Sequence, residues 1–277
     1  MNTNNPQGKF IVLGTARTGS NLLMSLLNSH PDIKMYAELF NLDAVSEDTL
    51  KSILDAPTKY LEKKLEENSK NSYKKVGFKL FYDHMTINYF NKIIPVKNIN
   101  SELLEKYQNF DLFIRKHYSL SDLSIKFNEF WDYIFRNGDF KIIHIKRRNK
   151  LKTLISLSTA YQTKKWMQWL PNSETKDVQL NLSFSECSNY FNEISRQEDI
   201  MDFLLKNHSV LELYYEDLEN NSQLVSDRVF KFLQVENRIV KSHLRKQVIK
   251  MPKEIILNYN NLKSNFKNSK WEHFFEE

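Results

Sequence analysis

Short apolar runs alternate with longer amphipathic segments along most of the chain. The apolar runs predict strands at residues 10–13, 33–36, 75–81, 141–146 and 209–214, and a further short run predicts one at 111–115. Apolar positions at helical spacing predict helices at residues 22–27, 46–68, 121–136, 151–157, 183–206 and 223–232, whereas 161–180 has the composition of a loop. Strands that alternate with helices predict an α/β fold with a central parallel sheet, flanking helices and helical insertions.

No stretch of linker composition divides this pattern, and no repeat of solenoid type is present. We therefore expect a single P-loop-like domain over residues 1–277, with a core at about 8–235 and a helical C-terminal extension at about 236–277. Apolar residues make up 41% of the chain, which is enough to build a full hydrophobic core.

The chain is basic, with a formal net charge of +6. This charge fits an anionic ligand, a nucleic acid or an acidic surface, but it selects none of them. The single cysteine, Cys187, excludes an internal disulfide and a zinc site built on several thiolates, so we expect a buried, inert thiol. The N-terminus has no apolar segment of a signal peptide, and no apolar run approaches the length of a membrane span, which predicts a cytoplasmic protein.

A strand, a glycine-framed turn at residues 14–20 and a helix follow one another near the N-terminus. The first amides of such a helix lack intrahelical partners and the helix dipole is positive there, so the turn can cradle an anion. Gly14 and Gly19 have the spacing of a P-loop, but Ser20 stands where the P-loop lysine is needed and Asn21 where the magnesium ligand is needed. The sequence therefore disfavours a magnesium-dependent NTPase but not phosphate binding; an ordinary turn without a ligand is the alternative.

A second basic turn, residues 146–149, follows the predicted strand at 141–146. Arg148 precedes the next helix and Ser156 lies about two turns along it, so both side chains could meet one phosphate. The planar guanidinium of arginine presents paired donors that suit a phosphate. Alternatively, Arg147 and Arg148 are solvated surface charges and Ser156 is an ordinary helix residue.

Together, the two turns resemble those of the PAPS-dependent sulfotransferases, which transfer a sulfuryl group from 3′-phosphoadenosine-5′-phosphosulfate (PAPS). Residues 14–23 resemble the family's 5′-phosphosulfate loop, and residues 148–156 resemble its 3′-phosphate motif. The closer likeness is to bacterial carbohydrate sulfotransferases, including the Nod-factor and trehalose types, and it also involves residues 30–41, 77–83, 157–169 and 214–218. Lys150 departs from many cytosolic relatives, which carry proline there, and this weakens assignment to the phenol and steroid branch.

The resemblance implies a metal-free, in-line transfer to the hydroxyl of an acceptor, which is expected to be a carbohydrate or a glycolipid. It implies donor contacts from Arg17, Thr18, Gly19, Ser20, Asn21, Arg148 and Ser156. Arg17 would stabilise the charge that builds as adenosine 3′,5′-bisphosphate leaves, and Glu38 would be the general base. His84 and Asp83 compete with Glu38 for that role because they also follow a strand end, and His30 competes more weakly.

Acceptor contacts are expected from Lys79, Asp83, Trp166 and Trp169. The two tryptophan rings could pack against the CH face of a sugar, or they could simply close the core. The expected partner is a small-molecule or saccharide acceptor, and no integral membrane segment is expected in this chain. A non-catalytic nucleotide- or polyanion-binding module and a P-loop kinase-like enzyme are the alternatives. Nucleic-acid binding is less favoured, because the basic residues are dispersed and no RNP or Cys/His finger pattern is present.

Overall fold

Five parallel strands form the centre of the structure, a computed structural model that describes residues 8–67, 73–89, 100–167, 178–242, 244 and 250–276. They are β1 (Gly8–Gly14), β2 (Ile33–Glu38), β3 (Lys75–Phe81), β4 (Phe140–Lys146) and β5 (Val210–Tyr214). Their order across the sheet is β2-β3-β1-β4-β5, and every neighbouring pair is parallel. The predicted parallel sheet of an α/β fold is therefore confirmed.

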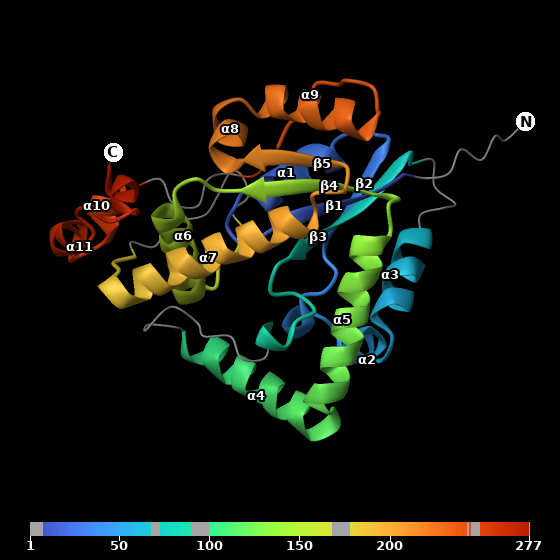
Figure 1. Cartoon of the computed structure of the whole chain (residues 1–277), viewed down its shortest axis with the longest axis horizontal. Helices are drawn as coiled ribbons and strands as arrows, with labels where there is room; N and C mark the ends of the chain where they lie inside the picture. The colour runs from blue at the N-terminus through green and yellow to red at the C-terminus, as the bar shows by residue number, and fades with distance from the viewer. Residues whose placement is uncertain are drawn as a thin grey trace, which may run out of the picture.

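Helices cover both faces of this sheet (Figure 1). On one face lie α1 (Ser20–Asn28), α8 (Tyr215–Asn220) and α9 (Ser222–Leu233). On the other lie α2 (Glu47–Asp55), α3 (Pro57–Glu66), α5 (Leu120–Arg136), α6 (Lys150–Thr163) and α7 (Phe184–Leu204), with α4 (Ser101–His117) farther out. Shorter helical segments are η1 (Leu42–Ala44), η2 (Ile87–Tyr89), α10 (Pro252–Ile255), α11 (Tyr259–Asn265) and η3 (Glu272–Phe275). Within the described ranges, none of the helices has the length and apolar character needed to cross a membrane.

Strand β1 is buried on both sides, as a central strand of a parallel sheet must be. Successive side chains of a strand point to opposite faces. Phe10 and Val12 therefore pack in the cluster formed with α1 and α9, whereas Ile11 and Leu13 pack in the cluster formed with α2, α3 and α5. The continuous apolar run in the sequence thus fills two cores at once and fixes the end of β1 between them.

The strand predicted at residues 111–115 is wrong, because these residues belong to α4. Asp111 and Arg115 are one helical turn apart, and their side chains pair at 2.7 Å. Ile114 is buried while the residues on either side of it are more exposed. One buried position among more exposed neighbours is typical of an amphipathic helix. A short apolar run in the sequence does not distinguish such a helix from a strand.

Two other boundaries differ from the prediction. The helix predicted at 46–68 is split into α2 and α3, because Pro57 lacks an amide hydrogen and starts a new helix at its first position. Helix α6 extends to Thr163, so the first three residues of the predicted loop are helical. Lys164 then ends α6 in a left-handed conformation, with φ of 57°. Residues 168–177 of that loop lie outside the described residues.

The C-terminal extension packs against α6 and α7. Phe274 and Phe275 are buried in the same apolar cluster as Phe191 of α7. Asn149, which caps the N-terminus of α6, donates from Nδ2 to the main-chain oxygen of Phe274 at 3.0 Å. The extension therefore contacts the start of α6 directly, next to the second basic turn.

Candidate active site

The carboxyl ends of all five strands lie at one edge of the sheet, because every pair is parallel. The chain leaves β1 toward β2 on one side and leaves β4 toward β5 on the other, so the adjacent ends of β1 and β4 form a switch point, the place where open α/β sheets bind ligands. A cavity of about 440 Å³ opens there. Its polar lining includes Arg17, Asn21, Arg147, Lys152, Ser156 and Lys250.

The turn after β1 has the geometry of an anion cradle. Gly14 lies so close to β4 that a Cβ atom there would come within 2.5 Å of the main-chain oxygen of Ile145. Gly19 has φ of 85° and precedes α1, where it has no side chain to cap the first amides. Thr18 and Ser20 are buried beside it, and the Thr18 hydroxyl donates to the oxygen of Thr15 at 2.8 Å. The turn therefore presents a helix N-terminus to the cavity.

Arg17 joins this turn to α6 and to the segment after α6. Its Nε donates to Ser156 Oγ at 2.9 Å, and its Nη1 donates to the main-chain oxygen of Trp166 at 2.7 Å. Burial and the neighbouring charge of Arg147 lower the pKa of Arg17 to about 10. Arg17 therefore stays cationic at neutral pH, and three residues predicted for the site meet at its guanidinium.

Glu38, at the carboxyl end of β2, pairs with Lys79 from the neighbouring strand. Lys79 Nζ donates to Glu38 Oε1 at 2.9 Å and also contacts Asn21 Oδ1, while Asn41 Nδ2 donates to Glu38 Oε2 at 3.0 Å. The Lys79 side chain is 2% exposed and the Glu38 side chain 24% exposed. Burial opposes ionisation of Glu38, but Lys79 and His84 outweigh it, so the pKa of Glu38 lies below that of an ordinary glutamate. Glu38 is thus a carboxylate that solvent or a ligand can reach.

His84 and Asp83 lie near this carboxylate but are placed differently. His84 is 2% exposed, and its Nδ1 accepts the amide hydrogen of Phe81 at 3.2 Å. Asp83 is partly buried, and its charge acts on the pKa of Glu38 in the direction opposite to that of Lys79. The buried ring of His84 is therefore less accessible to a ligand than the Glu38 carboxylate.

The structure does not bring Arg148 to Ser156. The Arg148 side chain is 50% exposed, and its two terminal nitrogens each lie 2.9 Å from an Asp217 oxygen. Arg147 lines the cavity with Ser156 instead. Two arginines follow one another directly after a strand, and the sequence gives no signal that distinguishes the one facing the cavity.

The predicted acceptor residues are described only in part. Trp166 lines the cavity, and its ring packs edge-on against Tyr161 with centroids 5.1 Å apart. Trp169 lies outside the described residues. The cavity is also lined by Tyr215, Lys152 and Lys250, which no pattern in the sequence selects. Their positions depend on the packing of α6, α8 and the extension, which no local pattern encodes.

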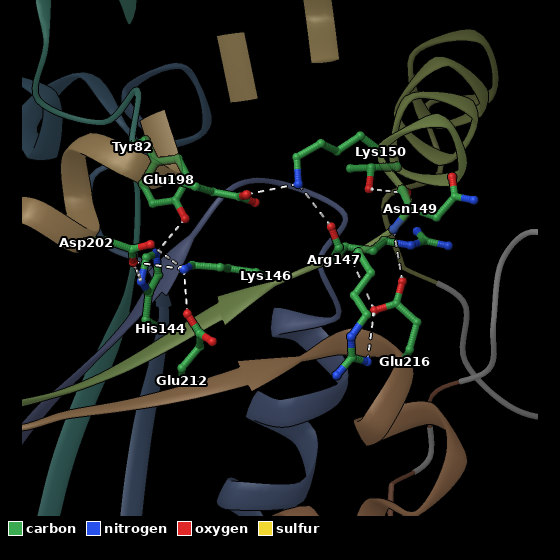
Figure 2. A network of polar contacts seen from close by, with 12 residues as sticks. Tyr82, His144, Lys146, Arg147, Asn149, Lys150, Glu198, Asp202, Glu212 and Glu216 are labelled. Carbon is green, nitrogen blue, oxygen red and sulfur yellow. Dashed lines mark hydrogen bonds and ion pairs between the residues drawn. The ribbon is translucent and has the colours of Figure 1, made fainter. Parts of the chain in front are cut away.

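A network of charged side chains, partly buried and partly exposed, supports the second basic turn (Figure 2). Lys146, at the end of β4, pairs with Asp202 at 2.7 Å and with Glu212 at 2.5 Å. Lys150 pairs with Glu198 of α7 at 2.9 Å, and both side chains are about nine-tenths buried. This pair ties the first turn of α6 to α7.

The environment of His144 in this network leads us to expect that the protein loses stability in acid. Its Nε2 lies 2.6 Å from the Tyr82 hydroxyl and its Nδ1 3.2 Å from Asp202. Burial and the charge of Lys146 lower the pKa of His144 to about 4. The imidazole of His144 therefore binds a proton more tightly in the unfolded chain than in the folded one. As pH falls from about 6.5 to about 4, we expect this difference to lower the free energy of unfolding by up to about 3 kcal/mol.

Urea unfolding between pH 7 and pH 4 measures this effect. His144→Gln, which cannot titrate, should show a shallower loss of stability than the wild type. His117→Gln, at an exposed position, controls for loss of an imidazole elsewhere. Equal pH slopes for wild type and His144→Gln would contradict the prediction.

No cluster of three or more histidine, cysteine, aspartate or glutamate residues is arranged for metal binding within the ranges that the structure describes. Cys187 is buried, and burial raises the pKa of its thiol to about 12. The described lining of the cavity carries guanidinium, ammonium, hydroxyl and carboxylate groups.

A sequence model described as "Sulfotransferase family" matches residues 9–238. Nodulation protein H of Rhizobium meliloti (strain 1021) is 23% identical over 276 residues, which cover 98% of this chain and 96% of that protein. A second Nodulation protein H from Rhizobium meliloti has the same identity and coverage. The crystal structure of a sulfotransferase from Alicyclobacillus acidocaldarius aligns over 94% of this chain and 92% of its own, with 14% identity and a TM-score of 0.45.

Proposed function

Because this chain belongs to the sulfotransferase family, we propose that it transfers a sulfuryl group from PAPS to a hydroxyl of a carbohydrate or glycolipid. The family assignment agrees with the resemblance seen in residues 14–23 and 148–156. The donor, the acceptor class and the catalytic residues are the parts of the proposal that experiments must test.

One observation carries the choice of donor: two separate turns supply arginines to the same cavity. Arg17 comes from the turn after β1 and Arg147 from the turn after β4. PAPS is anionic at both ends of its nucleotide, with a 5′-phosphosulfate and a 3′-phosphate. Among the described residues, the cavity lining contains four basic side chains and one carboxylate, Glu219, so its charge is complementary to such a ligand.

In the proposed reaction, the turn after β1 binds the 5′-phosphosulfate through Thr18, Gly19, Ser20 and the first amides of α1. Arg17 stabilises the negative charge that develops on the leaving bisphosphate. Such a transfer depends on positioning and charge stabilisation more than on covalent chemistry by the protein.

Glu38 takes the proton from the acceptor hydroxyl in the same proposal. Its lowered pKa keeps it ionised at neutral pH, and Lys79 and Asn41 hold its two oxygens in place. Lys79 also contacts Asn21, so the base is tied to the first turn of the helix that binds the donor. This link supports the proposed role of Glu38, because a general base must lie within reach of the acceptor hydroxyl that it deprotonates.

The proposed acceptor is a saccharide because the resemblance is to carbohydrate sulfotransferases, and Trp166 offers an aromatic ring at the cavity. A screen of saccharide and small-alcohol acceptors with labelled PAPS tests this part. We expect label to be incorporated into saccharides. Incorporation into small alcohols alone would keep the sulfotransferase and refute the saccharide acceptor.

The donor is tested by thermal unfolding with ligands. PAPS and adenosine 3′,5′-bisphosphate should raise the melting temperature in the presence of EDTA, because a ligand at about 100 times its Kd stabilises the folded state by about 2.7 kcal/mol. ATP with magnesium should stabilise much less. Equal stabilisation by ATP and magnesium, or a requirement for magnesium with the bisphosphate, would contradict the proposed donor and favour a kinase-like site.

A further inference from the structure

The side chain of Tyr89 connects the apolar core to the segment that follows β2. Tyr89 belongs to η2 and is 3% exposed, and its ring centroid lies 6.0 Å from that of His84 and 6.3 Å from that of Phe110. Packing of the ring in the core holds the hydroxyl in place. A buried hydroxyl is costly unless it forms hydrogen bonds, so the partners of this hydroxyl are informative.

The hydroxyl of Tyr89 bonds to two residues that follow Glu38 closely in the chain. It accepts the amide hydrogen of Asp43 at 3.3 Å, and it donates to Asn41 Oδ1 at 2.8 Å. A tyrosine hydroxyl carries one hydrogen, and the bond from Asp43 leaves that hydrogen for Asn41. Burial raises the pKa of Tyr89 well above that of an ordinary tyrosine, so the hydroxyl keeps its hydrogen at neutral pH.

The bond from Tyr89 determines which way the side-chain amide of Asn41 faces. The oxygen and nitrogen ends of an asparagine amide have nearly the same shape, so packing alone does not select one orientation. With Oδ1 bound to the Tyr89 hydroxyl, Nδ2 faces Glu38 and donates to Oε2 at 3.0 Å. The opposite orientation would place Oδ1 against the carboxylate oxygen and would remove the acceptor from the Tyr89 hydroxyl.

The main chain of Asn41 is held independently of its side chain. Its amide donates to the oxygen of Glu38 at 3.2 Å, and its oxygen accepts the amide hydrogen of Ala44 at 3.0 Å. The side chain of Asn41 therefore starts from a backbone that is fixed on both sides. The orientation of its amide group is the part that depends on Tyr89.

We propose that Tyr89 is a positioning residue for the Glu38 carboxylate, because its hydroxyl fixes the amide of Asn41 in the orientation that donates to Glu38. Asn41 binds one oxygen of the carboxylate, and Lys79 binds the other. The inference rests on the proposed function, since the positioning matters for catalysis only if Glu38 is the base. A base that is held in one orientation needs no reorganisation before proton transfer.

Groups from several elements act on the charge of Glu38. Lys79 and His84 favour its ionised form and Asp83 opposes it, while Arg17, in the turn after β1, interacts favourably with the carboxylate. A hydrogen bond from the asparagine amide also favours the ionised form. A phenylalanine in place of the tyrosine keeps all four of these groups, so a changed titration of Glu38 in that variant reports the orientation of the amide.

Carbon-13 NMR titration of the Glu38 carboxyl in the free protein tests the inference, with the signal assigned as the one missing in Glu38→Gln. Tyr89→Phe removes only the hydroxyl, and we expect it to raise the proton affinity of Glu38 about tenfold, the scale of one hydrogen bond. Asn41→Leu should have a similar effect, and adding Tyr89→Phe to Asn41→Leu should change the titration no further. Tyr36→Phe is the control, because it removes a hydroxyl that donates to the main-chain oxygen of Lys64 at 2.9 Å.

Turnover of labelled PAPS with the saccharide mixture of the acceptor screen provides a second measurement. Tyr89→Phe should lower the rate at saturating PAPS about 3- to 30-fold, because the base is held less well, and should leave the KM for PAPS unchanged. A role of Tyr89 in stability alone would lower the fraction of folded protein and leave the rate per folded molecule unchanged.

An unchanged titration of Glu38 in Tyr89→Phe would overturn the inference, and so would an equal shift on adding Tyr89→Phe to Asn41→Leu. A wild-type turnover rate in Tyr89→Phe would overturn it as well. If Asn41→Leu does not fold, Asn41→Ala provides the same comparison. Wild-type protein that does not turn over PAPS would refute the proposed function, and the titration would still decide whether Tyr89 acts on Glu38.

Discussion

Glu38→Gln should lower kcat by about 10²- to 10⁴-fold, the usual range for removal of a general base. The substitution keeps the shape of the side chain and its contact with Asn41, but it cannot accept a proton from the acceptor hydroxyl. Donor affinity should change little, because Glu38 lies on the Lys79 side of the turn and does not line the cavity that holds the arginines. Steady-state kinetics with a saturating donor measure the change.

Two further variants decide between Glu38 and its competitors. His84→Ala and Asp83→Asn should each retain more activity than Glu38→Gln. Glu47→Gln, at an exposed surface pair, controls for the loss of a carboxylate. Near wild-type kcat in Glu38→Gln combined with an inactive His84→Ala would move the role of base to His84.

Lys79→Met should shift the acid limb of the kcat/KM profile to higher pH. A base must be ionised to work, so activity falls as pH drops through its pKa. In the wild type, the pairing with Lys79 helps to lower the pKa of Glu38 despite its burial, which keeps this limb at low pH. Without the cation, burial dominates and the pKa rises, so kcat/KM should fall about 10- to 100-fold at pH 6 and less at pH 8.

The same substitution leaves a partly buried carboxylate unpaired, and we expect it to lower the unfolding free energy by up to about 3 kcal/mol. Lys79→Arg keeps the charge and should preserve more of the acid-side activity. An unchanged acid limb in a folded Lys79→Met enzyme would show that the group titrating in the profile is not Glu38.

The sheet could be predicted from the sequence because each strand is an apolar run between polar segments. Residues 75–81 coincide with β3, and the other four predicted strands lie within or next to β1, β2, β4 and β5. The strand predicted at 111–115 is wrong for a physical reason: three apolar residues in a row are compatible with a strand or with a helix. In the helix, Ile114 packs in the core and Asp111 pairs with Arg115 one turn away.

Part of the candidate site was equally accessible from the sequence. The turn framed by Gly14 and Gly19 and the strand end at Glu38 are local features, and the structure forms both. The pairing of Lys79 with Glu38 and the contact of Arg17 with Ser156 join segments that are distant in the chain. Such contacts depend on strand order and helix packing, which the hydrophobic pattern constrains only loosely.

The bond between Asn149 and Phe274 has a consequence for the order in which the protein matures during synthesis. The two residues are 125 positions apart, and the strands and the cap of α6 precede the extension in the chain. A ribosome that has completed the sheet has therefore not yet made the residue that holds Asn149. Since domains fold from the N-terminus as they emerge, the five strands can pair before the hydrogen bond from Asn149 to Phe274 can form. A nascent chain can thus contain a finished sheet well before the start of α6 has all of its contacts.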